Sequence, residues 1–168
     1  NNEWVLNGLG FLNKELGNNQ QAFEWWYKAA EFGSEGAQPA LGHAYLHGEG
    51  TPVDLDQAEY WLTKAAEQGV DSAQRHLAEV YIRKGDTDNA QKAMETLTSK
   101  ASNGDVYAMS ELGWLYSNNN KNNEQAFYWF SKCAELGHSG CMDGLGGLYM
   151  WGQGVPANLG LADRKSVG

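Results

Sequence analysis

The chain has little proline, little positive charge and no long apolar run. Three prolines stand against 21 glycines in 168 residues, which favours helices that end at glycines over a sandwich of strands and turns. The formal charge of -9 argues against nucleic acid or an anionic membrane surface as a partner, because phosphate binding needs clustered lysines and arginines. Since no stretch approaches the roughly 18 apolar residues that span a bilayer, we expect no membrane insertion.

An initiator methionine and a signal sequence are also lacking, so we expect this chain to be a processed or trimmed piece. Hydrophobic residues nevertheless make up 42% of the chain and aromatic residues 12%, which is not the composition of a disordered protein. A length of 168 residues is enough for one domain with a sizeable core.

Short motifs recur along the chain at intervals of 32 to 36 residues. Leucine followed by glycine stands at Leu9, Leu41, Leu112 and Leu145, while Leu77 is followed by alanine. Glycines close the first four units, at Gly33, Gly69, Gly104 and Gly137. We therefore expect a single domain of residues 1–168 with five units, which are approximately residues 1–33, 34–69, 70–104, 105–137 and 138–168.

Within one unit the apolar residues have helical spacing. They recur every four residues over 37–45, and at i, i+3, i+4, i+7 and i+8 over 58–66. Asp54 stands where the second helix is expected to begin and is a suitable cap for it. Each unit is thus predicted to be two antiparallel helices, which bury their apolar faces by stacking on the neighbouring units.

The full pattern is A-x3-LG-x2-Y-x2-G-x-G, a short loop and A-x2-W-x2-KAAE-x-G, and it resembles the Sel-one-like repeats, relatives of the tetratricopeptide repeats. The resemblance implies an all-α fold, a right-handed α/α solenoid of about five antiparallel helix pairs. The third unit departs from the pattern, with Ala78 in place of glycine, no tryptophan, and Lys100 in place of a small residue. The fifth unit lacks the tryptophan and the KAAE motif that should follow Ala162. We therefore expect an incomplete last repeat with a short helix, and a natural protein that continues beyond this end or has a different end.

The two cysteines, Cys133 and Cys141, replace alanines that other units carry, such as Ala65 and Ala73. If the hairpins stack in this register, the two positions face each other across a helix crossing, at a separation that suits a disulfide. Their spacing also resembles in part the bridges of the Helicobacter-type cysteine-rich members of the family. Two buried free thiols are the alternative. We favour the bridge, which, with the many exported members of the family, predicts a periplasmic or secreted protein.

Catalytic and metal-binding patterns are weak in this sequence. His43 and His47 have a metal-binding spacing, but Glu49 is the one further ligand nearby, so we expect two groove-lining histidines and no metal. Cys133 and His138 do not suit a nucleophile and its base, because the repeat phase puts the cysteine in a packed crossing. We expect no catalysis and no cofactor.

By resemblance to tetratricopeptide stacking, the first helix of each unit lines a concave face. The inward positions lie two before, two after and six after the leucine of each motif. From these positions we select Asn7, Phe11, His43, His47, Arg75, Glu79, Arg83, Trp114, Asn118, Asp143 and Trp151 as the binding residues. Aromatic residues and arginine are enriched at binding hot spots, although packing on a neighbouring helix explains Trp114 equally well. We therefore predict a scaffold or adaptor that binds a protein or peptide and no nucleic acid.

Two other functions stay open. Sel-one-like proteins also occur in bacteria as immunity partners beside secreted toxins, and the charge of -9 suits an inhibitor that captures a basic effector. The cysteine-rich relatives have been associated with β-lactamase activity, which would make the chain a cell-wall hydrolase. No serine is followed three residues later by lysine, which the serine form of that chemistry requires.

Overall fold

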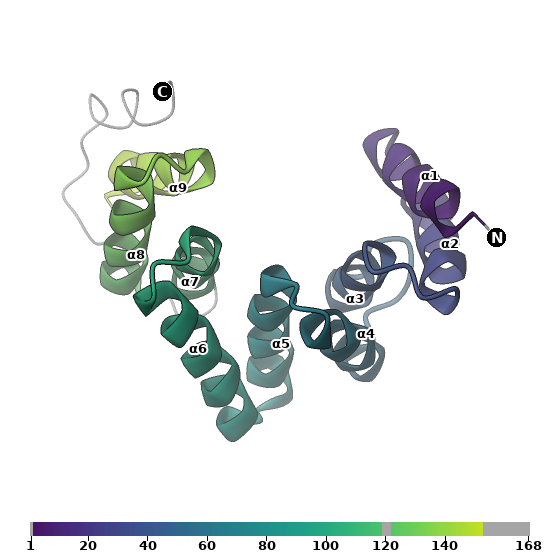
Figure 1. Cartoon of the computed structure of the whole chain (residues 1–168), viewed down its shortest axis with the longest axis horizontal. Coiled ribbons are helices and arrows are strands. Elements are labelled where there is room, and N and C mark those ends of the chain that lie inside the picture. The colour runs from purple at the N-terminus through teal and green to yellow at the C-terminus, as the bar shows by residue number, and fades with distance from the viewer. Residues whose placement is uncertain (1, 119–121, 153–168) are drawn as a thin grey trace. The chain divides into compact units, whose positions relative to one another are not determined.

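The computed structural model describes residues 2–118 and 122–152, and these residues form nine helices and no strand (Figure 1). They belong to two compact units that divide after Ala90. The first unit contains α1 (Glu3–Glu15), α2 (Asn19–Glu31), α3 (Ala37–His47), α4 (Leu55–Glu67) and α5 (Asp71–Lys84). Helix α6 (Thr87–Ser102) begins before the division, and the second unit continues with α7 (Val106–Asn118), α8 (Asn123–Glu135) and α9 (Ser139–Trp151).

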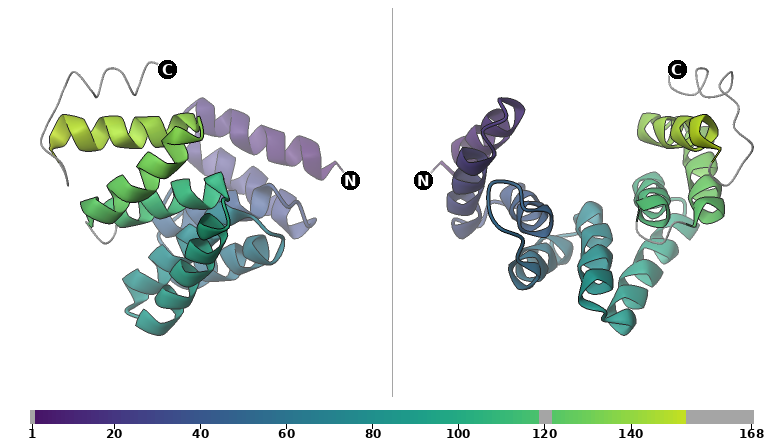
Figure 2. Two further views of the ribbon diagram at one scale, coloured as in Figure 1. Left: turned by 60° about the vertical axis from the view of Figure 1, so that its left-hand side comes forward. Right: turned by 180° about the vertical axis from the view of Figure 1, so that it is seen from behind.

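Helices that follow one another in the sequence pack together from α1 to α5 and from α7 to α9. In the first unit α1 packs on α2, α3 on α4, and each second helix also contacts the first helix of the next pair. The same arrangement recurs among α7, α8 and α9, coloured green to yellow in Figure 2. Three of the helix-loop-helix pairs that the sequence predicts, α1–α2, α3–α4 and α7–α8, are thus packed pairs in the fold.

The glycine of the leucine-glycine motif lets the two helices of a pair approach closely. A β-carbon on Gly42 would lie 2.6 Å from Cγ of Leu62 on α4, and one on Gly113 would overlap the ring of Phe130 on α8. Leu62 and Phe130 are fully buried, so neither can turn away without opening the core. Steric room between the two helices of a pair therefore explains this glycine.

The helix ends follow from local chemistry that the sequence displays. Gly33, Gly69 and Gly137 end their helices with φ values of 85°, 84° and 85°, a left-handed conformation that favours glycine. At the start of α4, Oδ1 of Asp54 accepts hydrogen bonds from the backbone N–H groups of Asp56 and Gln57, both at 3.0 Å. The predicted cap at Asp54 is thus present.

One prediction concerns residues that are not described, and another concerns the described helices. The part of the fifth repeat where the motif is incomplete, around Ala162, lies within 153–168, outside the described residues. Among the helices that are described, none combines the length and the apolar character needed to cross a bilayer.

Candidate functional site

An open pocket of about 400 Å³ lies in the first unit, between helices α1, α2, α3 and α5. Its walls combine apolar side chains with charged and imidazole groups. The apolar residues are Phe11, Trp26, Pro39 and Ala40, and the polar ones include Lys14, Glu15, His43, Glu49, Ser72 and His76. Most of the residues come from the first helices of successive repeats, which is the face that the repeat phase predicts for binding.

Two aromatic rings form one part of the pocket. Phe11 on α1 meets Trp26 on α2 edge to face, with ring centroids 5.5 Å apart. Trp26 is held in the core and is 4% exposed, whereas Phe11 is 48% exposed. The packing of the repeats therefore leaves an apolar ring in contact with solvent on a rigid base.

Charged groups stand beside these rings. Nζ of Lys14 on α1 forms an ion pair with the carboxylate of Glu49, in the loop that follows α3. Oε2 of Glu49 also lies 3.3 Å from Nδ1 of His43. These contacts tie the first repeat to the second at the pocket and fix the orientation of the carboxylate.

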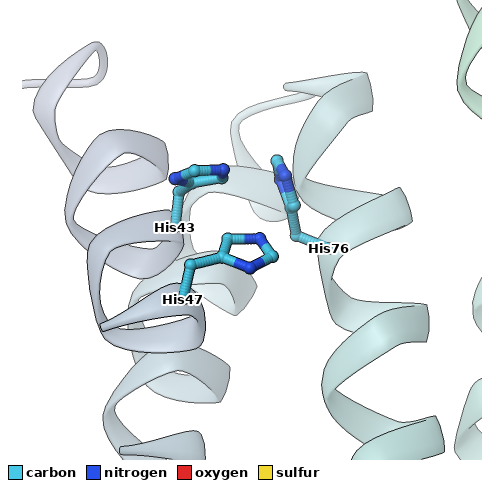
Figure 3. A group of neighbouring side chains, drawn as sticks. All are labelled: His43, His47 and His76. Carbon is cyan, nitrogen blue, oxygen red and sulfur yellow. The ribbon is translucent and has the colours of Figure 1, made fainter. Parts of the chain in front are cut away.

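Three histidines gather where α3 meets α5 (Figure 3). His43 and His47 lie one turn apart on α3, and their ring centroids are 4.3 Å apart. His76 approaches from α5, with its ring centroid 5.0 Å from that of His43 and 6.2 Å from that of His47. Each imidazole offers one nitrogen such that the three atoms lie within 4.8 Å of one another, a grouping that can hold a metal ion.

The three imidazoles differ in exposure and in the neighbouring groups that shift their pKa values. Burial, assisted by the guanidinium of Arg75, lowers the pKa of His76 to about 2. Burial and the neighbouring His47 lower the pKa of His43, and burial lowers the pKa of His47 although the carboxylate of Glu79 opposes the change. All three rings are therefore neutral at pH 7, which is the form that binds metal.

Four of the seven predicted groove residues of the first unit lie at the pocket or at the histidine cluster. They are Phe11, His43, His47 and Arg75. Phe11 and His43 line the pocket, and Arg75 places Nη2 2.7 Å from Nε2 of His76. Asn7 instead lines a second pocket, of about 430 Å³, with Glu3 and Trp4 and the turn that precedes α3.

The structure differs from the prediction at Glu79. This residue is 5% exposed, and its Oε1 accepts a hydrogen bond from Nη2 of Arg83 at 2.6 Å. Nη1 of Arg83 also donates to the backbone carbonyl of Leu46, at 2.8 Å. Glu79 lies in the contact between α3 and α5 and does not present its carboxylate to a partner, which corrects its assignment to the binding surface.

In the second unit, the predicted groove residues differ in their packing. Trp114 is half-buried and meets the buried ring of Phe130 edge to face, with centroids 5.1 Å apart, so packing accounts for much of its role. Asn118 and Asp143 are exposed on α7 and α9, and Trp151 at the end of α9 is 73% exposed.

Cys133 on α8 and Cys141 on α9 form a disulfide whose Cα atoms are 6.0 Å apart, and both residues are fully buried. Ala65 and Ala73 occupy the corresponding positions of the first unit and are also fully buried. With its sulfur in the bridge, Cys133 has no thiolate to offer as a nucleophile to a neighbouring His138.

Sequence reasoning missed the third histidine and the cation beside it. His76 stands one residue before Leu77, a position that the groove phase excludes, and 29 residues separate it from His47. Lys14 was missed for the same reason, since its partner Glu49 belongs to the next repeat. A search about one repeat apart for histidine paired with histidine, and for lysine paired with a carboxylate, would have found both.

The Sel1 repeat family model matches residues 3–34, 37–70, 106–138 and 139–162, which is more than half of the chain. The residues between the second and third matches belong to the third predicted repeat, which departs from the pattern at Ala78 and Lys100.

Among curated proteins, "DAP3-binding cell death enhancer 1" of Rattus norvegicus is 43% identical over 162 residues. The match covers 94% of this chain but only 32% of that protein, so the chain spans about a third of the length of the relative.

Among solved structures, a Sel1 repeat protein from Oxalobacter formigenes is 26% identical with a TM-score of 0.62, over 98% of this chain and 71% of that one. The protective antigen c5321 of uropathogenic Escherichia coli, which displays an SLR fold, has a TM-score of 0.45 and 25% identity, over 98% of this chain and 45% of that one. The family match and the first of these structures confirm the expected fold class, an all-α solenoid of helix pairs.

Proposed function

This chain belongs to the Sel1 repeat family, and on that premise we propose that it is a non-catalytic scaffold that binds a protein or peptide. The observation that carries the proposal is the 400 Å³ pocket in which Phe11 is 48% exposed over a buried Trp26. Exposed aromatic rings on a rigid base are typical anchors of protein interfaces. The name of the rat relative records binding to a protein, DAP3, which supports a protein partner.

The composition of the pocket favours a partner segment with one apolar side chain between polar groups. Phe11, Pro39 and Ala40 offer apolar surface, while the ion pair of Lys14 with Glu49 stands beside it. An inserted apolar side chain would cover the exposed ring, and the charged pair would orient the flanking peptide.

Peptides selected from a random library on the immobilised chain test this proposal. We expect Phe11→Ala, which removes the ring, and Ala40→Arg, which fills the pocket, each to weaken binding of the selected peptides by at least about tenfold. Tyr60→Ala is the matched control, because Tyr60 is 50% exposed on the second helix α4 and does not line the pocket. Peptides that bind both pocket variants as tightly as the natural chain contradict the proposal.

The charge of -9 favours a basic partner and supports the narrower function of an inhibitor that neutralises a basic effector. An inhibitor of this kind is expected to bind with a rate that falls steeply as salt is added, since charge steers the encounter. Binding to a basic protein that does not change between about 50 mM and 500 mM salt would favour the general scaffold over the inhibitor.

A periplasmic or extracellular location is proposed from the disulfide between Cys133 and Cys141. Structural disulfides persist in oxidising compartments and are rare in reducing ones. Thiol titration of denatured protein taken from its natural source tests the proposal, and two free thiols would contradict it.

A further inference from the structure

We propose that His43, His47 and His76 bind a transition-metal ion of the Zn²⁺ class. Two of the ligands lie one turn apart on α3, and the third comes from α5 of the next repeat (Figure 3). Imidazole nitrogens select borderline metals such as Zn²⁺, Ni²⁺ and Cu²⁺ over Ca²⁺ or Mg²⁺, which prefer oxygen. The proposal does not rest on the binding of a peptide to the pocket.

The separation of the nitrogens is close to what such an ion needs. A point equidistant from three atoms that are 4.8 Å apart lies about 2.8 Å from each, against roughly 2.0–2.1 Å for a Zn–N bond. Each ring therefore needs to move by less than about 1 Å. His43 and His47 retain partial exposure and have room to turn toward the buried His76.

Carboxylate groups lie near Nδ1 of two of the imidazoles. Oε2 of Glu49 is 3.3 Å from Nδ1 of His43, and Oε1 of Glu79 is 3.9 Å from Nδ1 of His47. A carboxylate near Nδ1 favours the tautomer that carries its proton there, which leaves the lone pair of Nε2 for a metal.

His76 is a buried histidine, and its hydrogen bond with Arg75 is one that a metal ion can replace. It is 6% exposed, and its ring also interacts with the backbone of Ser72, one turn earlier on α5. Its Nε2 lies 2.7 Å from Nη2 of Arg75. Because the guanidinium holds one nitrogen of His76 and adds a positive charge beside the cluster, we infer that Arg75 and the metal compete.

Calorimetric titration of the metal-free chain, without a histidine tag, with Zn²⁺ at pH 7 tests the proposal. We expect one Zn²⁺ per chain, and binding weakened by at least about tenfold in both His43→Gln and His47→Gln. His138→Gln is the matched control, because it removes the remaining histidine of the chain and should leave the affinity unchanged. His76→Gln is interpreted only beside its circular dichroism, since His76 is buried.

Two results overturn the metal site. The first is that the natural chain binds Zn²⁺ no more tightly than a variant that carries both His43→Gln and His47→Gln. The second is that His138→Gln loses as much Zn²⁺ affinity as the variants of His43 and His47. The competing role of Arg75 predicts that Arg75→Gln tightens binding, and an unchanged or weaker affinity overturns that role. His47 does not line the pocket, so a loss of Zn²⁺ in His47→Gln is separable from a loss of peptide in Phe11→Ala.

Discussion

The carboxylate of Glu79 lies 2.6 Å from the guanidinium of Arg83, one turn further along α5, and only 5% of Glu79 is exposed. The arginine reaches in from the surface, with 40% of its side chain exposed, and also binds the carbonyl of Leu46 on α3. The pair therefore satisfies a buried charge and at the same time joins two repeats.

Replacement of Arg83 by alanine is expected to destabilise the first unit. The change strands a buried carboxylate, and we expect a loss of about 1–2 kcal/mol, below the 3–5 kcal/mol of a fully buried pair because Arg83 is partly solvated. Urea unfolding followed by circular dichroism measures the effect.

Lys84→Ala is the control for this variant, because Lys84 pairs with the exposed Asp56 and the partly exposed Glu59 and should matter much less. Addition of Glu79→Gln to the Arg83 variant should restore part of the stability, since it removes the stranded charge. Equal losses for Arg83→Ala and Lys84→Ala would contradict the importance of burial here.

Replacement of Gly113 by alanine should destabilise the second unit. The added methyl group would overlap the fully buried ring of Phe130, so we expect a loss of about 1–3 kcal/mol in thermal or chemical unfolding. Gly147 is the matched control, because no heavy atom lies within 4 Å of a β-carbon placed on it. Gly147→Ala is expected to be neutral or to stabilise helix α9. If both variants behave alike, close packing at Gly113 is not the reason for its glycine.

Loss of the disulfide should weaken the fold without changing its core. We expect the variant with alanine at both Cys133 and Cys141 to lose about 2.5 kcal/mol of unfolding free energy, from the larger entropy of its unfolded chain. Alanine fits these sites, since it fills the equivalent positions 65 and 73, so a cavity contributes little. Unfolding with and without a reductant makes the comparison, and a reductant should not affect the double variant.

Removal of the cap of α4 should cost about 1 kcal/mol. Asp54→Ala takes away the oxygen that accepts the N–H groups of Asp56 and Gln57, whereas Asp54→Asn keeps an acceptor. The asparagine variant should therefore melt close to the natural chain and the alanine variant below it. An alanine variant as stable as the other two would show that solvent satisfies these groups equally well.

The helices and their ends were predictable because their causes are local. A residue such as Gly69 adopts its left-handed φ of 84° to end the helix that it follows, and Asp54 caps the helix that begins beside it. The pairing of Cys133 with Cys141 was also within reach, since both residues flank a single turn.

The candidate binding surface was less predictable. A fixed phase from each leucine placed Glu79 on the surface and excluded His76, but packing of α5 on α3 buries both. Exposure on this face depends on the side chains of the neighbouring repeat, and a periodic pattern within one helix contains no information about them.

The sequence by itself determined the repeat, the helix pairs and the glycines that punctuate them, because helix propensity, capping and chain reversal act over a few residues. Only the tertiary structure decided that His76 joins His43 and His47 and that Phe11 opens onto a pocket beside Lys14 and Glu49. These groups are a repeat apart in the chain, and they meet because the apolar faces of successive hairpins must be buried against each other.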